Sequence, residues 1–199
     1  MENLLSVLLG GSWASGINLY MTAAGLGIAQ RMNWIELPGE LTVLGHPLII
    51  ALAVIMYVVE FVADKIPFVD STWDMVHTFI RPTGGAMIGY LGMAQSDPLL
   101  QTTVAILTGA VALSSHLTKA TTRAAINSAP MGFTNSIASV TEDAAVFTVL
   151  YFIVKHPVIA AFLAIGLIAL SIWILRKFFR FISRLFRPVK KEEVLSQKA

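Results

Sequence analysis

The sequence contains no cysteine, which excludes disulfide bonds and thiolate metal sites. Charged residues are also scarce, because Asp, Glu, Lys and Arg make up only 13% of the 199 residues, roughly half their share in soluble domains. Hydrophobic residues account for 56% of the chain, and the mean hydropathy is +0.73. These proportions indicate an integral membrane protein, with the lipid bilayer as its first partner.

The few charges are unevenly distributed along the chain. Residues 1–175 hold six bases against ten acids, whereas residues 176–199 hold eight bases against two acids. A basic block directly after an apolar run is typical of the cytoplasmic end of a last membrane helix, and it attracts anionic lipid. We therefore expect a multi-pass protein of the inner (plasma) membrane with a cytoplasmic C-terminus and a basic tail over residues 176–199.

Within this tail, bases and phenylalanines alternate over residues 176–187 with the period of a helix. The pattern predicts an amphipathic helix lying on the membrane surface. Nucleic-acid binding is the weaker interpretation, because the phenylalanines suit a membrane interface better than a groove of DNA or RNA.

Long apolar segments alternate with short breaks rich in proline, glycine or charge. The segments predict an all-α bundle, in which residues 1–175 form a single transmembrane domain with four to five spans. The helical segments are expected at residues 3–30, 46–63, 99–128 and 158–175, with a marginal span over 82–96 and a short apolar run over 144–154. Residues 33–45 predict a loop or a re-entrant segment, and residues 135–143 a polar connection.

A weak internal repeat divides this domain. Shifted by 100 residues, the segment at 14–24 shares Ser, Thr and Ala with the segment at 114–124, and His46-Pro47 matches His156-Pro157 at a shift of 110. The repeat predicts two halves, about 3–95 and 99–175, which would be inverted if residues 82–96 cross the membrane. The N-terminus then lies outside, with Arg31 and the tail on the cytoplasmic side.

The most highly charged stretch of the chain lies between residues 60 and 81. Four of its side chains recur at spacings of four, three and four, which places them on one face of a helix: Asp70, Asp74, His77 and Arg81. A solvated face of an interfacial helix is one interpretation. A cation or phosphate site is the other, because two carboxylates and an imidazole on consecutive turns are metal ligands.

A second polar face has the same spacings on the long helix over residues 99–128. It consists of His116, Lys119, Arg123 and Asn127. Charge inside a membrane helix needs a partner or marks a pathway, although this half of the helix could also project beyond the bilayer. The available counter-ions are Asp64, Asp70, Asp74, Glu142 and Asp143. We predict that the two faces meet in a buried ionic network, and that Lys65 is also held by partners within the bundle.

Glu60 lies near the end of a predicted span and has no base one turn away. It is either a carboxylate at the headgroup layer or, if it lies within the membrane, a proton carrier.

Several of these motifs resemble one bacterial membrane family. They are the run Glu60-x-x-x-Asp64-Lys65-Ile66-Pro67-x-x-Asp70, the segment at 81–86, Lys119 to Arg123, Asn127 to Pro130, and the segment at 139–143. The chain is similar over most of residues 5–175 to the family catalogued as domain of unknown function 4126. The resemblance implies a polytopic membrane protein and supplies no mechanism.

The sequence thus favours movement of a small or amphiphilic anionic solute between the two halves. Lys119, Arg123, His116, Asn127 and Arg81 would bind the solute. Glu60, Asp64, Asp70, Asp74, His77, Glu142 and Asp143 would manage coupled protons or cations. A chain of 199 residues can form only a thin wall around a transport pathway unless two copies associate. A homodimer is therefore a possible arrangement.

Two alternatives remain. One is a scaffold whose ionic network fixes helix register, and the other is an enzyme acting on lipid phosphates through Mg²⁺ at Asp70 and Asp74. A non-enzymatic protein without a cofactor is favoured, because no glycine-rich phosphate loop, nucleophile elbow or His-Glu-x-x-His motif is present.

Overall fold

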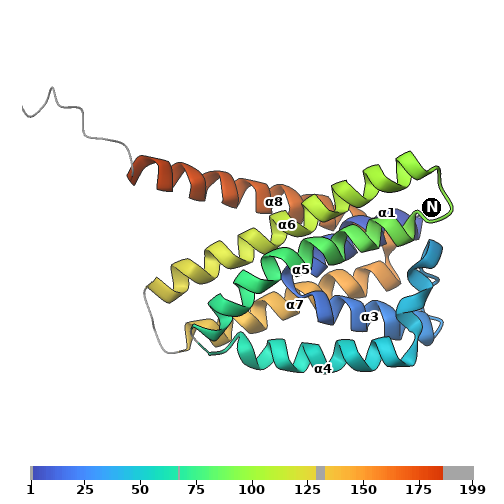
Figure 1. Ribbon diagram of the computed structural model, residues 1–199, viewed down its shortest axis with the longest axis horizontal. Coiled ribbons are helices and arrows are strands. Elements are labelled where there is room, and N and C mark those ends of the chain that lie inside the picture. Colours follow the sequence, from blue (N-terminus) through green and yellow to red (C-terminus); the bar gives the residue numbers. More distant parts are fainter. Residues whose placement is uncertain (1, 67, 129–132, 186–199) are drawn as a thin grey trace, which may run out of the picture.

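The computed structural model describes residues 2–66, 68–128 and 133–185 (Figure 1). Within these ranges every regular element is helical, as predicted, with eight α-helices, a π-helix (η1) and a 3-10 helix (η2). In chain order they are α1 (Glu2–Leu5), η1 (Ser6–Gly11), α2 (Ser12–Ile17), α3 (Leu19–Arg31), η2 (Gly39–Gly45), α4 (Pro47–Ala63), α5 (Val69–Gly92), α6 (Pro98–Ser128), α7 (Thr134–Lys155) and α8 (Pro157–Leu185).

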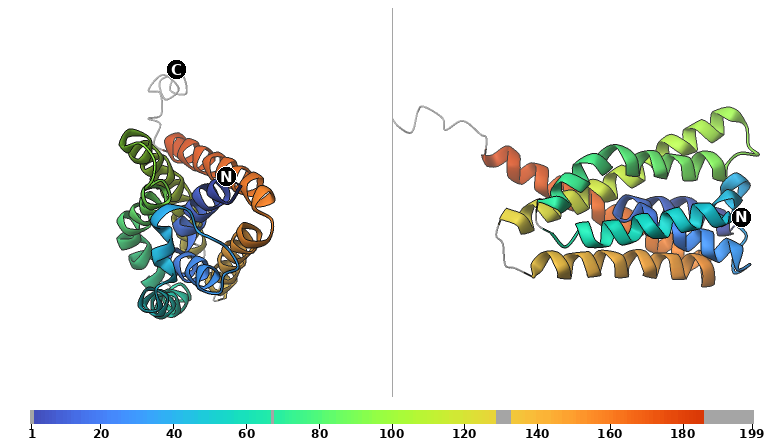
Figure 2. Two further views of the ribbon diagram at one scale, coloured as in Figure 1. Left: turned by 90° about the vertical axis from the view of Figure 1, so that its right-hand side faces the viewer. Right: turned by 60° about the horizontal axis from the view of Figure 1, so that its bottom comes forward.

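The first apolar segment is a hairpin with a break at Asn18, not the single long helix predicted for residues 3–30. Helix runs to Ile17, and Asn18 is then extended, with φ −145° and ψ 98°. From there α3 returns towards the end of the bundle where the chain begins (Figures 1 and 2), and Leu26 lies beside Gly11. Asn18 starts the new helix because its side-chain oxygen accepts a hydrogen bond from Met21 N at 2.9 Å, as an N-cap residue does.

The hairpin changes the predicted distribution of charge between the two ends of the bundle. Arg31 ends α3 and therefore lies at the end where the chain starts, whereas α8 runs to the opposite end (Figure 1). Arg31 and the described end of α8 therefore lie at opposite ends of the bundle. The end of α4, which precedes Lys65, lies towards the same end of the bundle as the end of α8.

α4 has the bounds that the sequence predicts. Its N-cap is His46, whose Nδ1 accepts a hydrogen bond from Leu48 N at 3.3 Å. Pro47 occupies the first helical position, where its missing N–H leaves no bond unmade. The preceding residues form a loop that ends in η2, and η2 and α4 meet at a bend of 71°.

α5 and α6 pack closely along much of their length. The predicted helix after Pro67 and the predicted marginal span over 82–96 are one continuous helix, since Pro82 lies inside α5. A Cβ atom added at Gly85 would overlap with the Cβ of Ala112, and one at Gly89 with Oγ1 of Thr108. Glycine therefore allows the backbones to approach, as small residues do in membrane helix pairs.

α7 begins earlier than predicted. The segment at 135–143 is its first half and not a polar connection. Asn135, Ser139 and Glu142 recur at spacings of four and three, so they share one face. Asn135 and Ser139 are buried, which shows that this face points into the bundle.

α8 continues through Arg176 to Leu185 without a break. The amphipathic helix predicted over residues 176–187 is therefore an extension of the last apolar helix as far as Leu185. The rest of the tail, residues 186–199, lies outside the described residues.

Three helices of the described part are long and apolar enough to cross a membrane, namely α6, α7 and α8. The bent pair of η2 and α4 adds a fourth if it counts as one span. The chain is therefore a multi-pass membrane protein by length and composition, with three to four candidate spans against the four to five predicted.

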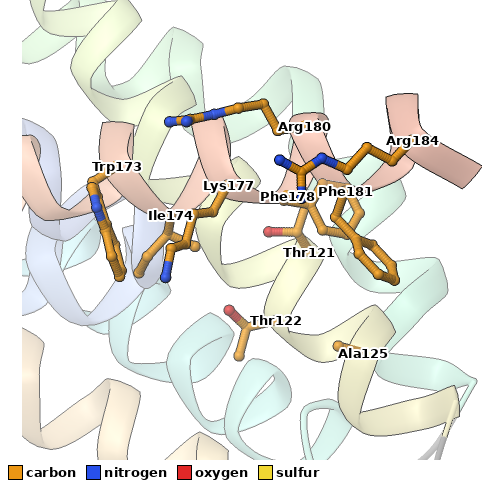
Figure 3. A pocket seen from close by; sticks show the side chains of 10 residues that line it. All are labelled: Thr121, Thr122, Ala125, Trp173, Ile174, Lys177, Phe178, Arg180, Phe181 and Arg184. Atoms are coloured by element: carbon orange, nitrogen blue, oxygen red, sulfur yellow. The ribbon is translucent and has the colours of Figure 1, made fainter.

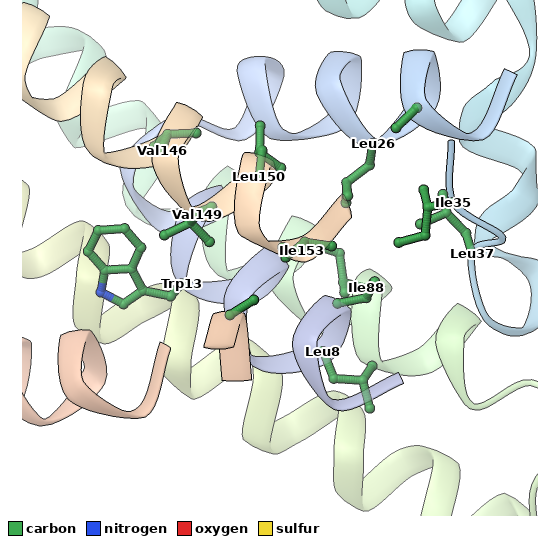
Figure 4. Packing of buried hydrophobic residues seen from close by; sticks show 14 of the residues in the cluster. Leu8, Trp13, Leu26, Ile35, Leu37, Ile88, Val146, Val149, Leu150 and Ile153 are labelled. Carbon is green, nitrogen blue, oxygen red and sulfur yellow. The ribbon is translucent and has the colours of Figure 1, made fainter. Parts of the chain in front are cut away.

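Apolar side chains cover much of the outside of the bundle. Leu48, Leu52, Phe79 and Phe162 are between 62% and 79% exposed. An apolar core, which includes Leu26, Val149 and Ile153, holds the hairpin against α7 (Figure 4). The rest of the interior contains many buried charged side chains, which are rare in the interior of a soluble protein.

Candidate functional site

Two charged helix faces meet inside the bundle, as predicted. The α5 face consists of four side chains that are each at most 4% exposed: Asp70, Asp74, His77 and Arg81. The α6 face contributes His116, Lys119 and Arg123, each at most 3% exposed, and the half-buried Asn127. The alternative of a solvated, interfacial face on α5 is therefore wrong.

Arg81 joins three helices. Its Nη2 lies 2.7 Å from Oε1 of Glu60 on α4, and its Nη1 lies 3.1 Å from Oδ1 of Asp74. Nη1 also donates to Nδ1 of His116 on α6 at 2.8 Å. Glu60 is completely buried, so it is not a headgroup carboxylate, and the base that it lacks on its own helix is supplied by α5.

Lys119 and Arg123 of α6 bind carboxylates that come from α4, from the residue after it, and from α7. Lys119 Nζ lies 2.7 Å from Oδ2 of Asp64, 3.5 Å from Oε1 of Glu60 and 3.6 Å from Oε2 of Glu142. Arg123 grips Glu142 with two hydrogen bonds, Nη2 to Oε2 at 2.6 Å and Nε to Oε1 at 3.0 Å. Its remaining N–H groups donate to the carbonyl oxygens of Asp64 and Asn135 and to Oδ2 of Asp64. All five donors of Arg123 are thus used.

Asp70 lies at the outer end of this network. Its carboxylate accepts hydrogen bonds from Nδ2 of Asn127 at 3.1 and 3.3 Å and lies 3.9 Å from Nη1 of Arg123. Nδ2 of Asn135 in turn donates to Oδ1 of Asn127 at 2.8 Å. The side-chain amides of Asn127 and Asn135 therefore hold Asp70 in place. These hydrogen bonds form a second link between α5, α6 and α7.

Both histidines of the network are bonded at both ring nitrogens. Nδ1 of His77 lies 2.8 Å from the carbonyl oxygen of Trp73 and must donate to it, and Nε2 lies 3.1 Å from the hydroxyl of Tyr20. For His116, Nδ1 accepts from Arg81, and Nε2 lies 2.9 Å from Oγ1 of Thr78. A ring that accepts a hydrogen bond at one nitrogen carries no proton there.

The break in the hairpin faces the same network. The carbonyl oxygens of Gly16 and Ile17, at the end of α2, accept from Arg81 Nη1 at 3.5 Å and Lys119 Nζ at 3.4 Å. At the start of α3, Nδ2 of Asn18 donates to Oδ1 of Asp143 at 3.0 Å. The negative end of one helix dipole thus faces cations, and the positive end of the other faces a carboxylate.

The residues that belong to the site but were not predicted include Asn18, Tyr20, Thr78 and Asn135. The sequence carries a signal for Asn18, because asparagine is a preferred N-cap residue and lies here within an apolar segment. Asp143 bonds to Asn18 and, at 3.4 Å, to the hydroxyl of Tyr57. It thus lies beside the hairpin.

The network holds more acid than base. Five carboxylates (Glu60, Asp64, Asp70, Asp74 and Glu142) share ion pairs with only three bases, a formal surplus of two negative charges. Oε2 of Glu60, Oδ1 of Asp64 and Oδ2 of Asp74 are buried without a hydrogen-bond partner. Burying unpaired charge is costly, so the surplus favours the binding of protons or cations.

The network reaches the surface at one carboxylate. The side chain of Glu142 is 16% exposed, whereas those of the other four acids are at most 5% exposed. Glu142 lines a crevice of about 370 Å³ between α6 and α7, together with Thr122, Ile126, Ile137 and Thr141. The carboxylate that Arg123 binds therefore also lines this crevice.

Lys65 is held differently from the other bases. Its Nζ donates to the carbonyl oxygen of Phe61 at 2.9 Å and to Oγ of Ser139 at 3.4 Å, and it lies over the Phe61 ring. Partial burial lowers the pKa of the Lys65 ammonium. Its partners are thus neutral groups at the edge of the network.

No group of three or more histidines and acids is arranged to hold a metal ion in the described part of the chain. Asp70 is bound by Asn127, Asp74 by Arg81, and His77 by Tyr20. The three side chains that a metal site on α5 would need therefore have separate partners, which weakens the proposal of Mg²⁺ chemistry there.

Asn18 offers a test of the hairpin apex. Replacing it by alanine removes the cap of α3, worth about 1 kcal/mol. It also leaves Asp143 with only the longer bond from Tyr57, and the loss of its shorter hydrogen bond costs about 1–3 kcal/mol. We expect the Asn18→Ala protein to unfold at a lower concentration of denaturing detergent. Asn18→Ser keeps a capping oxygen but shortens the reach to Asp143, so it should lose less stability. Wild-type stability of Asn18→Ala would contradict this account.

Comparison with known proteins agrees with the resemblance noted from the motifs. The sequence pattern of the family described as Domain of unknown function (DUF4126) matches residues 5–177. No protein of curated function and no solved structure matches the chain. The match covers most of the chain, including the hairpin, the network and all the candidate spans except the last residues of α8, so the protein belongs to the DUF4126 family.

Proposed function

We propose that this protein moves a small or amphiphilic anionic solute across the membrane, coupled to proton binding by its buried carboxylates. The observation that supports this proposal is a broken hairpin whose two helix ends face the network of buried charge. Discontinuous helices that direct their ends at a polar site within the bilayer are typical of secondary transporters.

The balance of charge supplies the coupling. Lys119 and Arg123 are occupied by Asp64 and Glu142, and the surplus negative charge repels anions. A proton on Glu142 or Asp64 weakens these pairs and frees N–H donors of the two bases. An anion then binds only after protons have bound, which couples the two movements.

The remaining residues extend these roles. Arg81, His116 and Asn127 would complete the solute site, because each has donors near the two bases. Glu60, Asp70, Asp74, His77 and Asp143 would hold or pass on protons or cations. Inverted halves at 3–95 and 99–175 and a homodimer belong to this proposal, since both would let the site open to alternate sides.

Transport can be tested in liposomes that carry a pH-sensitive dye inside. Chloride, inorganic phosphate or p-toluenesulfonate is added outside at a lower pH, and acidification of the interior is followed. We expect at least one anion to accelerate acidification compared with liposomes that lack protein. In Arg123→Gln this acidification should slow by about tenfold or more, because lost charge-assisted hydrogen bonds cost about 1.5–3 kcal/mol.

Two further variants make this result specific. Arg123→Lys keeps the charge without the two-pronged grip on Glu142, so it should retain part of the rate. Arg31→Gln removes an exposed charge at the end of α3 and should behave as wild type. Anion-dependent acidification that is equal in wild type and Arg123→Gln would refute the proposed site.

A scaffold remains the second candidate. Its supporting observation is that all five donors of Arg123 are already bonded to protein groups, which suits a lock on helix register. If no anion accelerates acidification and Arg123→Gln loses only stability, the scaffold is favoured over the transporter.

A further inference from the structure

We propose that a groove between α6 and α8 binds an anionic phospholipid. The groove has a volume of about 580 Å³, within the range of small-molecule sites. It is lined by Thr121, Thr122 and Ala125 of α6 and by Trp173, Ile174, Lys177, Phe178, Arg180, Phe181 and Arg184 of α8 (Figure 3). None of the acids or bases of the ionic network lines it, although it shares Thr122 with the crevice at Glu142. The inference does not depend on the transport proposal.

The groove opens where the two helices diverge. α6 and α8 cross near their middles, and their C-terminal ends then separate (Figure 1). Gly166 and the apolar part of α8 come before this point, and the bases of α8 begin at Arg176. The groove therefore straddles the change from the hydrocarbon layer to the headgroup layer, the depth at which Trp and Lys or Arg are enriched.

Its lining matches both parts of a phospholipid. Trp173, Ile174, Phe178 and Phe181 offer an apolar surface for acyl chains. Lys177, Arg180 and Arg184 carry three positive charges, and among the described residues no acidic side chain lines this groove. Lys177 lies 4.3 Å from the centre of the Trp173 ring and extends from α8 into the space between the helices (Figure 3).

The positive charge of the groove favours a negatively charged occupant. Each base near the membrane surface contributes about 1 kcal/mol to the attraction of anionic lipid. A second copy of the chain would bring the same three bases to the groove. The tail also has more bases than acids, since Arg187, Lys190, Lys191 and Lys198 outnumber Glu192 and Glu193. Both would be repelled, whereas a phosphate diester is attracted.

The fluorescence of Trp173 provides the test. The full-length protein is reconstituted in phosphatidylcholine vesicles that contain either brominated phosphatidylglycerol or brominated phosphatidylcholine at equal fractions. Bromine quenches a tryptophan in contact with it, and the part due to Trp173 is the difference between wild type and Trp173→Phe. We expect stronger quenching of Trp173 by the brominated anionic lipid.

Charge variants decide whether the groove is responsible. Arg180→Gln/Arg184→Gln keeps Lys177 beside the reporter, and it should lower the preference for phosphatidylglycerol by on the order of tenfold. The matched control Arg31→Gln/Lys155→Gln removes two exposed bases elsewhere and should keep the preference. Equal quenching by the two lipids, or a preference that survives in Arg180→Gln/Arg184→Gln, would overturn the proposal. Weak quenching by both lipids would also overturn it, because protein would then cover the groove.

Discussion

Replacement of Arg81 by glutamine should lower the free energy of unfolding by about 3–5 kcal/mol, the cost of breaking a buried ion pair. Glutamine cannot neutralise Glu60 and Asp74, which lie 2.7 and 3.1 Å from the guanidinium. It also removes the donor to His116. The measurement is reversible unfolding in mixed micelles, with helix content followed by circular dichroism.

A double-mutant cycle separates the charge from the shape of the side chain. In Glu60→Gln/Arg81→Gln one of the two carboxylates that lose Arg81 is gone as well, so the double variant should be more stable than Arg81→Gln alone. Arg31→Gln, exposed at the end of α3, should unfold as wild type does. If Arg81→Gln were as stable as Arg31→Gln, the network would contribute nothing to folding.

The second large effect is expected at Gly16. A Cβ atom there would overlap with Oγ of Ser115 and with the carbonyl oxygen of Ala112. Backbone atoms cannot move aside as a flexible side chain does, so Gly16→Ala must push α2 away from α6. We expect a loss of about 1–3 kcal/mol or more from overpacking alone, with further loss because Arg81 and Lys119 bond to carbonyl oxygens at this position.

Gly166 supplies the matched control for Gly16. It lies in α8, and nothing comes within 4 Å of a Cβ atom built on it. Gly166→Ala should therefore keep or slightly raise stability, because alanine favours a helix over glycine. If Gly16→Ala and Gly166→Ala unfolded alike, the close approach of α2 and α6 would be wrong.

The charged faces of α5 and α6 were predictable because spacing along a continuous helix determines which side chains share a face. A local signal also predicted the start of α4, because His46-Pro47 acts within a single turn. Both α4 and α6 begin within a residue of their predicted positions. Neither inference needs knowledge of what the helix packs against.

The hairpin could not be predicted from hydropathy. The residues before and after Asn18 are about equally apolar, and a hydropathy average carries no information about the direction of the chain. One extended residue reverses the path, and with it the end of the bundle at which Arg31 lies. Similarly, Glu60 and Arg81 are 21 residues apart on different helices, so their pairing is a tertiary contact that no local spacing reveals.

The first half of α7 illustrates a different error. Residues 135–143 were assigned to a connection because they are polar, yet their polar face is turned inward towards Arg123. Spacings of four and three among Asn135, Ser139 and Glu142 are the same signal that identified α5 and α6. In this protein polarity marks the interior, so spacing is the better guide.

The placement of charge on α5 also constrains how the protein is made. An Asp or Arg near the centre of a helix costs about 3 kcal/mol each on insertion, so Asp74 and Arg81 keep α5 from partitioning into lipid by itself. Its partner Glu60 is synthesised before it, but Lys119 and His116 follow on α6. We therefore expect α5, which is not among the candidate spans by hydropathy, to join the bundle only after α6 has emerged and brought His116 and Lys119 to it.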